Sequence, residues 1–210
     1  MEKMPEKFGF YAILTNPMRG YEYVTQILVE YKIAFVQLRM KDAGLSSIED
    51  IACKMRKITL GTSTRLIIND YPDIAKKINA DGVHIGQTDM QYSDARKIMG
   101  DSAIVGLSTH SPFQTKAACE LSPDYIGIGP VFPTPTKKNP DPVIGISTMK
   151  EMLSISSVPG VAIGGITLEK LPEVLAAGAQ NFSMVRPVNA SDNPEKVIKE
   201  ILRIYAEKKF

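Results

Sequence analysis

The 210-residue sequence contains only two cysteines, no long apolar run and almost no excess of charge. Cys53 and Cys119 do not have the spacing of metal ligands, and two cysteines are too few for a disulfide scaffold. A reducing, cytoplasmic compartment is therefore predicted. No stretch of about 18 apolar residues is present, so no membrane span is expected, and the first residues have no apolar stretch of signal-peptide length. Lys and Arg total 25 against 23 Asp and Glu, a balance too even for a typical nucleic-acid-binding domain.

Apolar residues make up 44% of the sequence, which together with the low net charge excludes disorder as the dominant state. No linker, low-complexity tract or block of charge divides the chain, so residues 1–210 are interpreted as a single domain. Short β-branched apolar runs alternate with longer amphipathic segments. This alternation indicates a parallel sheet with crossover helices.

Eight strands are predicted, at Gly9–Thr15, Phe35–Arg39, Arg65–Asn69, Gly82–Ile85, Ala103–Ser108, Asp124–Ile128, Val161–Gly164 and Asn181–Val185. Helices are predicted near Tyr21–Tyr31, Ser47–Thr59, Pro72–Asn79, Asp94–Met99, Pro112–Glu120, Ser147–Ile155, Leu168–Ala177 and Pro194–Lys208. Eight units of about 26 residues suit a compact α/β fold, the single-domain (β/α)8 TIM barrel. An open doubly wound sheet is the alternative, although it needs fewer strands.

Three predicted helices begin with capping signals. Ser111-Pro112-Phe113-Gln114 and Ser46-Ser47-Ile48-Glu49 have the spacing of a capping box, and Asn193 precedes Pro194. These signals predict where the chain leaves a loop and enters a helix.

Polar residues gather immediately after the predicted strands, where a barrel of this kind builds its site. Gln37, Arg39 and Lys41 alternate along one strand end and therefore point to one side. Arginine and lysine in this position favour an anionic ligand such as a phosphate. A solvated strand end is the alternative.

Two carboxylates follow adjacent predicted strands, Asp70 after Asn69 and Asp89 in the next loop. Together they could hold one magnesium ion, which typically takes one or two carboxylates, several waters and substrate phosphate oxygens. The alternative is that each aspartate caps the helix that follows it. The nearby cationic side chains favour a metal–diphosphate site.

Two late segments have the composition of a phosphate site. Gly164-Gly165 ends the seventh predicted strand and Ser183-Met184-Val185-Arg186 ends the eighth, the strands whose loops frequently bind phosphate in such barrels. A tight strand-to-helix turn is the alternative for the glycine pair. The long proline-rich loop 130–142 resembles a lid that carries Thr134, Thr136 and Lys137 as phosphate-binding groups, or else a disordered surface loop.

The two histidines are interpreted cautiously. His84 lies within a predicted strand, where a hydrogen-bonded interior histidine is more common than a catalytic one. His110 falls at the expected site but directly before the Ser111 cap. No nucleophilic triad and no histidine metal motif is recognisable.

In order along the chain, several segments resemble the thiamin phosphate synthase (thiamin phosphate pyrophosphorylase) family. They are Val36-Gln37-Leu38-Arg39-Met40-Lys41, Ile67-Ile68-Asn69-Asp70, Ala80-Asp81-Gly82-Val83-His84-Ile85-Gly86-Gln87-Thr88-Asp89, Gly106-Leu107-Ser108, residues 124–137 and Ala162-Ile163-Gly164-Gly165-Ile166. The resemblance implies a (β/α)8 barrel and a magnesium-dependent transferase. The implied substrates are hydroxymethylpyrimidine diphosphate and a thiazole phosphate, and the sequence leaves formation of a homo-oligomer open.

The resemblance also implies residue roles. Arg39, Lys41 and Lys137 would neutralise the diphosphate with magnesium on Asp70 and Asp89, and Ser108 would lie near the reacting centre. Gln37 and Asn69 resemble contacts to the pyrimidine and the diphosphate. The residues that resemble the thiazole-phosphate site are Thr134, Thr136, Gly165, Val185 and Arg186.

One departure is Arg186-Pro187, where the family usually has two small residues, Ser-Ala; it could strengthen or crowd the phosphate site. Two alternatives share the barrel. A related thiazole tautomerase typically has a histidine after strand six, where this chain has Gly129-Pro130-Val131-Phe132. A non-catalytic sensor of phosphate ligands would bind without turnover.

Overall fold

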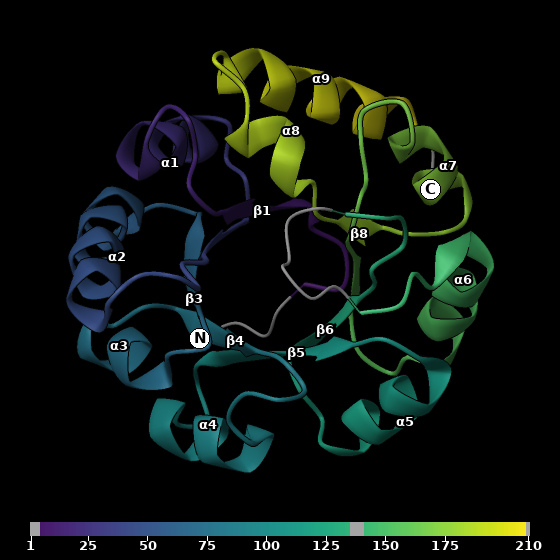
Figure 1. Ribbon diagram of the computed structural model, residues 1–210, viewed down its shortest axis with the longest axis horizontal. Coiled ribbons are helices and arrows are strands. Elements are labelled where there is room, and N and C mark those ends of the chain that lie inside the picture. The colour runs from purple at the N-terminus through teal and green to yellow at the C-terminus, as the bar shows by residue number, and fades with distance from the viewer. Residues whose placement is uncertain (1–4, 135–140, 209–210) are drawn as a thin grey trace.

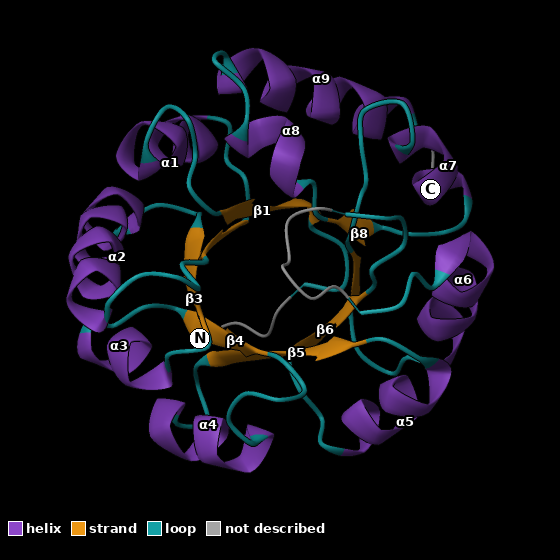
Figure 2. Cartoon of the chain, in the orientation of Figure 1, coloured by secondary structure: helices purple, strands orange, loops and turns teal. Residues whose placement is uncertain are grey.

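The computed structural model describes residues 5–134 and 141–208, which form one closed barrel of parallel strands surrounded by helices (Figures 1 and 2). The strands are β1 Gly9–Leu14, β2 Phe35–Leu38, β3 Arg65–Asn69, β4 Gly82–Ile85, β5 Ile104–Thr109, β6 Tyr125–Ile128, β7 Gly160–Ala162 and β8 Asn181–Phe182. The helices are α1 Tyr21–Glu30, α2 Leu45–Thr59, α3 Pro72–Lys77, α4 Tyr92–Met99, α5 Pro112–Glu120, α6 Gly145–Ile155, α7 Leu171–Ala176, α8 Val185–Asn189 and α9 Pro194–Glu207.

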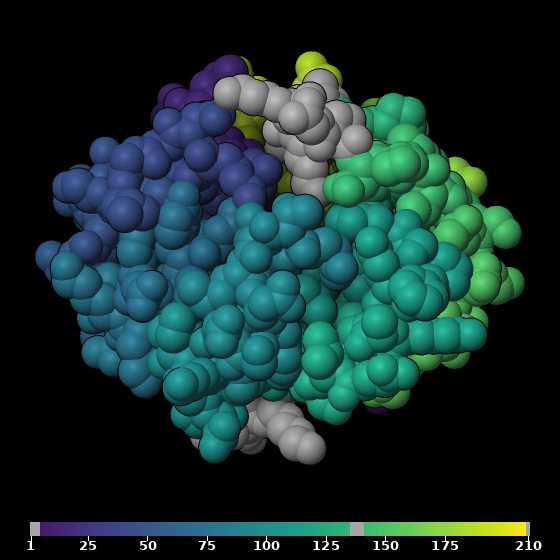
Figure 3. Space-filling model, turned by 60° about the horizontal axis from the view of Figure 1, so that its bottom comes forward, coloured from purple at the N-terminus to yellow at the C-terminus, as the bar shows by residue number. Residues whose placement is uncertain are grey.

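The predicted TIM barrel is confirmed by the strand order. Each strand pairs in parallel with its sequence neighbour, and β1 closes the ring on β8 through the register Gly9↔Asn181 and Phe10↔Phe182. An open sheet would leave β1 and β8 as edges, so that alternative is wrong. In the space-filling view, the surface runs from blue through teal to green, the colours of the part of the chain that contains α2 to α6 (Figure 3).

Apolar side chains fill two layers. The larger cluster lies between the strands and the helices. A smaller cluster fills the interior of the barrel and contains Tyr11, Ile13, Phe35, Ile67, Ile104, Tyr125 and Val161. This interior cluster closes the barrel below the site, so any ligand must enter at the carboxyl ends of the strands.

The end of the chain's eighth unit differs from the prediction. β8 stops at Phe182 instead of reaching Val185, and Val185 and Arg186 begin the short helix α8. The Asn189 side chain accepts a hydrogen bond from the Thr15 amide (2.8 Å) and donates one to the Ile13 carbonyl (2.8 Å). These contacts hold α8 against the end of β1. A helix of five residues is too short to show a helical pattern of apolar residues in the sequence.

Two of the three predicted helix caps are confirmed. Ser111 Oγ accepts from the Gln114 amide (3.2 Å) and Asn193 Oδ1 accepts from the Lys196 amide (3.1 Å). The predicted box at Ser46 is wrong, because α2 begins at Leu45 after Gly44 and has no side-chain cap.

No helix within the described ranges combines the length and the apolar character needed to cross a membrane. Cys53 and Cys119 are both free thiols.

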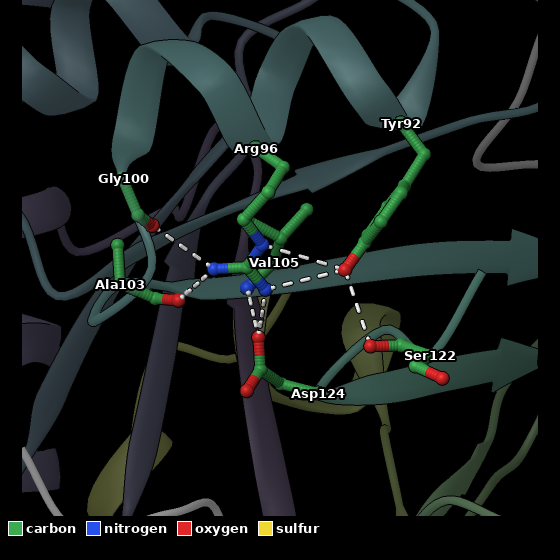
Figure 4. Close-up of polar contacts among 7 residues, drawn as sticks. All are labelled: Tyr92, Arg96, Gly100, Ala103, Val105, Ser122 and Asp124. Carbon is green, nitrogen blue, oxygen red and sulfur yellow. Dashed lines mark hydrogen bonds and ion pairs between the residues drawn. The ribbon is translucent and has the colours of Figure 1, made fainter.

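At the amino end of the strands, an ion pair joins neighbouring barrel units (Figure 4). Arg96 Nη2 on α4 lies 2.5 Å from Asp124 Oδ2, which also accepts a hydrogen bond from the Val105 amide at 2.8 Å. The Arg96 Nη1 atom donates to the carbonyls of Gly100 and Ala103. One carboxylate therefore connects α4, the start of β5 and the start of β6.

Replacing Asp124 with alanine should destabilise the fold by about 2 kcal/mol, because it leaves the Val105 amide and the Arg96 guanidinium without their shared acceptor. In a chain of this size the melting temperature should fall by roughly 6 °C. Thermal unfolding measures the effect. Asp101→Ala removes an exposed carboxylate in the turn before β5 and serves as control. An equal loss in both variants would contradict a specific role for the ion pair.

Candidate active site

A cavity of about 580 Å³ opens at the carboxyl ends of the strands. Its wall contains every predicted site residue that the structure describes, namely Gln37, Arg39, Lys41, Asn69, Asp70, Asp89, Ser108, Thr134, Gly165, Val185 and Arg186. Thr136 and Lys137 lie outside the described residues. Residues that are distant in sequence therefore surround one space, because they lie at or after the carboxyl ends of the strands β2 to β8 of a closed barrel.

Lys41 lies between the two carboxylates of the predicted metal site. Its Nζ forms an ion pair with Asp70 Oδ2 and lies 3.4 Å from Asp89 Oδ1. The second Asp89 oxygen accepts a hydrogen bond from the Gly86 amide at 2.9 Å. Asp70 has a left-handed backbone (φ 67°), and its amide donates to the His84 carbonyl at 2.8 Å. The loops after β3 and β4 thus each supply a carboxylate, and both carboxylates contact the Lys41 ammonium from the loop after β2.

The alternative that these aspartates cap helices is wrong. The residue before α3 is Tyr71 and the residue before α4 is Gln91, and neither helix has a side-chain cap. Asp70 and Asp89 bond Lys41 instead. The two aspartates therefore line the cavity and do not cap α3 or α4.

The two carboxylates of Asp70 and Asp89 share a single ammonium, that of Lys41, and their pKa values shift in opposite directions. Burial raises the pKa of Asp70 to about 6, the neighbouring Asp89 acts in the same direction, and Lys41 opposes both. Burial also acts to raise the pKa of Asp89, but hydrogen bonds and the Lys41 charge lower it overall. Two close carboxylates disfavour full ionisation of both. Their oxygens are the ligands a hard divalent cation prefers.

Within residues 5–134 and 141–208, no three Asp, Glu, His or Cys side chains form a metal-binding group. Two carboxylates fit magnesium nevertheless, since this ion commonly takes only one or two from the protein and completes its shell with water and substrate phosphate.

Arg39 and Gln37 extend the polar wall deeper into the barrel. Burial lowers the pKa of the Arg39 guanidinium, and the carboxylates of Asp70, Asp42 and Asp89 act against that effect. A guanidinium remains charged in any case. Gln37 is buried, and its Nε2 donates to the Tyr11 hydroxyl at 2.9 Å.

Sequence reasoning missed the tyrosines Tyr11 and Tyr125. Both are buried inside the barrel and line the cavity, and their hydroxyls lie 2.7 Å apart. The available signal was a tyrosine at an inward position of an otherwise apolar strand, where a hydroxyl needs a partner. His84, interpreted as a hydrogen-bonded interior histidine, contacts Tyr125 and Ser108 through its two ring nitrogens.

The glycine pair packs two loops against each other at the cavity wall. Gly164 and Gly165 have positive φ angles of 101° and 62°. A Cβ atom on Gly165 would lie 2.4 Å from the Pro133 carbonyl oxygen, so only glycine fits there. The next helix, α7, begins only at Leu171, which excludes a tight strand-to-helix turn. The pair therefore shapes the wall next to Thr134, and its binding of phosphate stays a prediction.

Comparisons with known proteins identify the family and agree with the fold. A family model described as thiamine monophosphate synthase matches residues 10–188. A thiamine-phosphate synthase of Caldicellulosiruptor bescii is 38% identical over 181 residues, 86% of this chain and 83% of the relative. One from Gloeobacter violaceus is 40% identical over 182 residues, 87% of this chain, which spans 53% of that longer relative. The solved thiamine phosphate pyrophosphorylase of Pyrococcus furiosus superposes with a TM-score of 0.86 at 27% identity, covering 96% of this chain and 97% of that one.

Proposed function

Because the chain belongs to the thiamine monophosphate synthase family, a family of transferases, we propose that it catalyses the magnesium-dependent formation of thiamine phosphate. The donor is hydroxymethylpyrimidine diphosphate and the acceptor is a thiazole phosphate. The methylene carbon–oxygen bond breaks, diphosphate leaves with the bonding electrons, and the lone pair of the thiazole nitrogen forms the new carbon–nitrogen bond.

The observation that carries this proposal is the contact of Lys41 with Asp70 and Asp89 beside Arg39 in one cavity. Departure of diphosphate needs its negative charge to be neutralised more than it needs a strong base. Asp70 and Asp89 would hold magnesium, which when bound supplies positive charge to the leaving group. Arg39 offers a fork of N–H donors to the diphosphate oxygens, and Lys41 a mobile positive charge.

The remaining roles follow from position in the cavity. Gln37 and Asn69 would contact the pyrimidine and the diphosphate, and Ser108 would lie near the reacting carbon. The apolar side chains of Ile13 and Ile163 in the same cavity would keep water from that carbon. The residues proposed for the thiazole phosphate are Thr134, Thr136, Gly165, Val185 and Arg186, and Lys137 would help Arg39 and Lys41 to neutralise the diphosphate.

The proposal is tested by mixing the purified protein with both substrates, with magnesium or with excess chelator, and measuring diphosphate and thiamine phosphate. Magnesium-dependent formation of both products, in equal amounts, is the expected result. Binding of the substrates by folded protein without any product would overturn the proposal and favour a sensor. Conversion of a thiazole phosphate alone would favour the tautomerase.

Replacing Arg186 with serine should raise the Michaelis constant for the thiazole phosphate about fivefold and leave that for the diphosphate unchanged. The guanidinium lies at the exposed edge of the cavity, where water and salt weaken its attraction for phosphate. Steady-state kinetics with each substrate varied measures the difference. Arg203→Ser, on the exposed face of α9, is the matched control. An unchanged constant would place Arg186 outside the phosphate site.

Magnesium affinity should fall as the pH drops below about 6, the pKa of Asp70, because a proton then competes for the carboxylate. The folded chain holds this proton more tightly than the unfolded chain, so ionisation of Asp70 as the pH rises disfavours folding until a cation compensates. Each pH unit below 6 should weaken binding about tenfold. The rise in melting temperature on adding magnesium, at pH 5 and 7.5, measures this. Equal rises at both pH values would contradict it.

A further inference from the structure

A continuous series of hydrogen bonds crosses the floor of the cavity. Gln37 Nε2 lies 2.9 Å from the Tyr11 hydroxyl, which lies 2.7 Å from the Tyr125 hydroxyl. Tyr125 lies 2.9 Å from His84 Nδ1, and His84 Nε2 lies 2.9 Å from Ser108 Oγ. The five residues come from β2, β1, β6, β4 and β5. We call this series the floor chain.

The floor chain is buried where apolar side chains would fit as well. Tyr11, Tyr125 and Gln37 are each 1% exposed. The Tyr125 ring occupies space that is open only because residue 106 is glycine, since a Cβ there would lie 2.2 Å from the ring. Apolar side chains in place of Tyr11, Tyr125 and Gln37 together would leave no buried hydroxyl or amide to satisfy at these three positions. Stability alone therefore gives little reason for this arrangement.

Donors and acceptors in the floor chain have one consistent direction. An amide nitrogen can only donate, so the Tyr11 oxygen accepts from Gln37. Among the described residues, the Tyr125 oxygen is then the acceptor that remains for the Tyr11 hydrogen. Tyr125 then donates to His84 Nδ1, which places the ring hydrogen on Nε2, facing Ser108. Ser108 accepts this hydrogen bond and keeps its own hydroxyl hydrogen for a group in the cavity.

We propose that His84 is a positioning residue, which holds the Ser108 hydroxyl as a donor toward the substrate, and that Tyr11 and Tyr125 fix the tautomer of His84 that does this. Gln37 and Ser108 both line the cavity, so the floor chain connects two substrate contacts. Reversal of the Gln37 amide would reverse every donor along the series. Only the kinetic part of this inference rests on the proposed function.

The tautomer can be measured without any substrate, from the nitrogen chemical shifts of His84 in ¹⁵N-labelled protein. The floor chain predicts hydrogen on Nε2 in the unmodified protein and a mixture of tautomers in Tyr125→Phe. Tyr11→Phe combined with Tyr125→Phe removes both hydroxyls together and leaves the Gln37 amide and His84 Nδ1 without a partner, so its melting temperature should fall, and the measurement shows whether the variant stays folded. Hydrogen on Nδ1 in the unmodified protein, or an unchanged tautomer in Tyr125→Phe, would overturn the proposal.

The kinetic test is a double-mutant cycle between His84→Phe and Ser108→Ala. Each change should lower kcat about tenfold, the value of one hydrogen bond, and the double variant should be no slower than Ser108→Ala. A roughly hundredfold, additive loss would show that His84 acts independently of Ser108. If His84→Phe fails to fold, Tyr125→Phe replaces it in the cycle. Tyr31→Phe, whose hydroxyl bonds Glu195 on the outer surface, is the control.

If the unmodified protein makes no thiamine phosphate, the proposed function fails while the nitrogen shifts still decide the direction of the floor chain. If it turns over but His84 has the opposite tautomer, the function stands and the positioning role fails. The two outcomes are therefore distinguishable.

Discussion

Replacing Asp89 with alanine is expected to lower magnesium-dependent turnover about a thousandfold. The change removes one of two carboxylates that contact Lys41 and would hold the cation, and the loss of about 4 kcal/mol of charge stabilisation corresponds to that factor. It also leaves Asp70 and Lys41 as a simple ion pair, in which the pKa of Asp70 should fall because the neighbouring negative charge is gone. Rates at saturating substrate over a range of magnesium concentrations measure the effect.

The control for Asp89→Ala is Asp73→Ala, which removes an exposed carboxylate from the first turn of α3. The melting temperatures of both variants should lie close to that of the unmodified protein, because Asp89 accepts only one backbone hydrogen bond. Normal turnover by Asp89→Ala would reject the metal assignment. A large fall in melting temperature would instead assign Asp89 to the stability of the loop.

Local patterns were sufficient for much of the fold. The strands could be predicted because a fully buried parallel strand is a short β-branched run, as in Arg65–Asn69, and its limits were found to the residue. The cap at Ser111 was predictable because serine, proline and glutamine occupy the N-cap, the first and the third positions of the helix. Ser46 has the same spacing, yet α2 starts at Leu45. Capping signals that are one or two residues out of place cannot be corrected without tertiary contacts.

The site residues could be placed after strands, but their partners could not. The ion pair of Lys41 with Asp70 joins two loops and depends on the left-handed backbone at Asp70, which no local pattern specifies. The floor chain joins residues from strands far apart in sequence. In the sequence alone, Tyr11 and Tyr125 look like ordinary core residues, because only the closed barrel brings their hydroxyls together. The resemblance to a family identified the positions of the site residues, whereas the direction of the hydrogen bonds in the floor chain could be derived only from the structure.

Arg39→Gln is expected to lower kcat/KM for the diphosphate substrate by a factor of about 300, because a neutral amide replaces the charged fork that lies beside Asp70 and Asp89. The Michaelis constant for the thiazole phosphate should change little, since Arg39 follows β2 whereas the Gly164–Gly165 wall follows β7, and β1 and β8 lie between these two strands in the closed barrel. Arg39→Lys should recover only part of the loss, because an ammonium keeps the charge but cannot donate two parallel hydrogen bonds.

The comparison of these two Arg39 variants separates charge from geometry. If lysine restores full activity, Arg39 contributes only a positive charge, and the requirement for a guanidinium fork is wrong. If both variants raise the two Michaelis constants equally, Arg39 supports the cavity as a whole and does not recognise the diphosphate. Arg203→Gln on α9 controls for the loss of a surface charge. A selective loss toward the diphosphate would place the leaving group between Arg39 and the Asp70–Asp89 pair, where the reaction develops its negative charge.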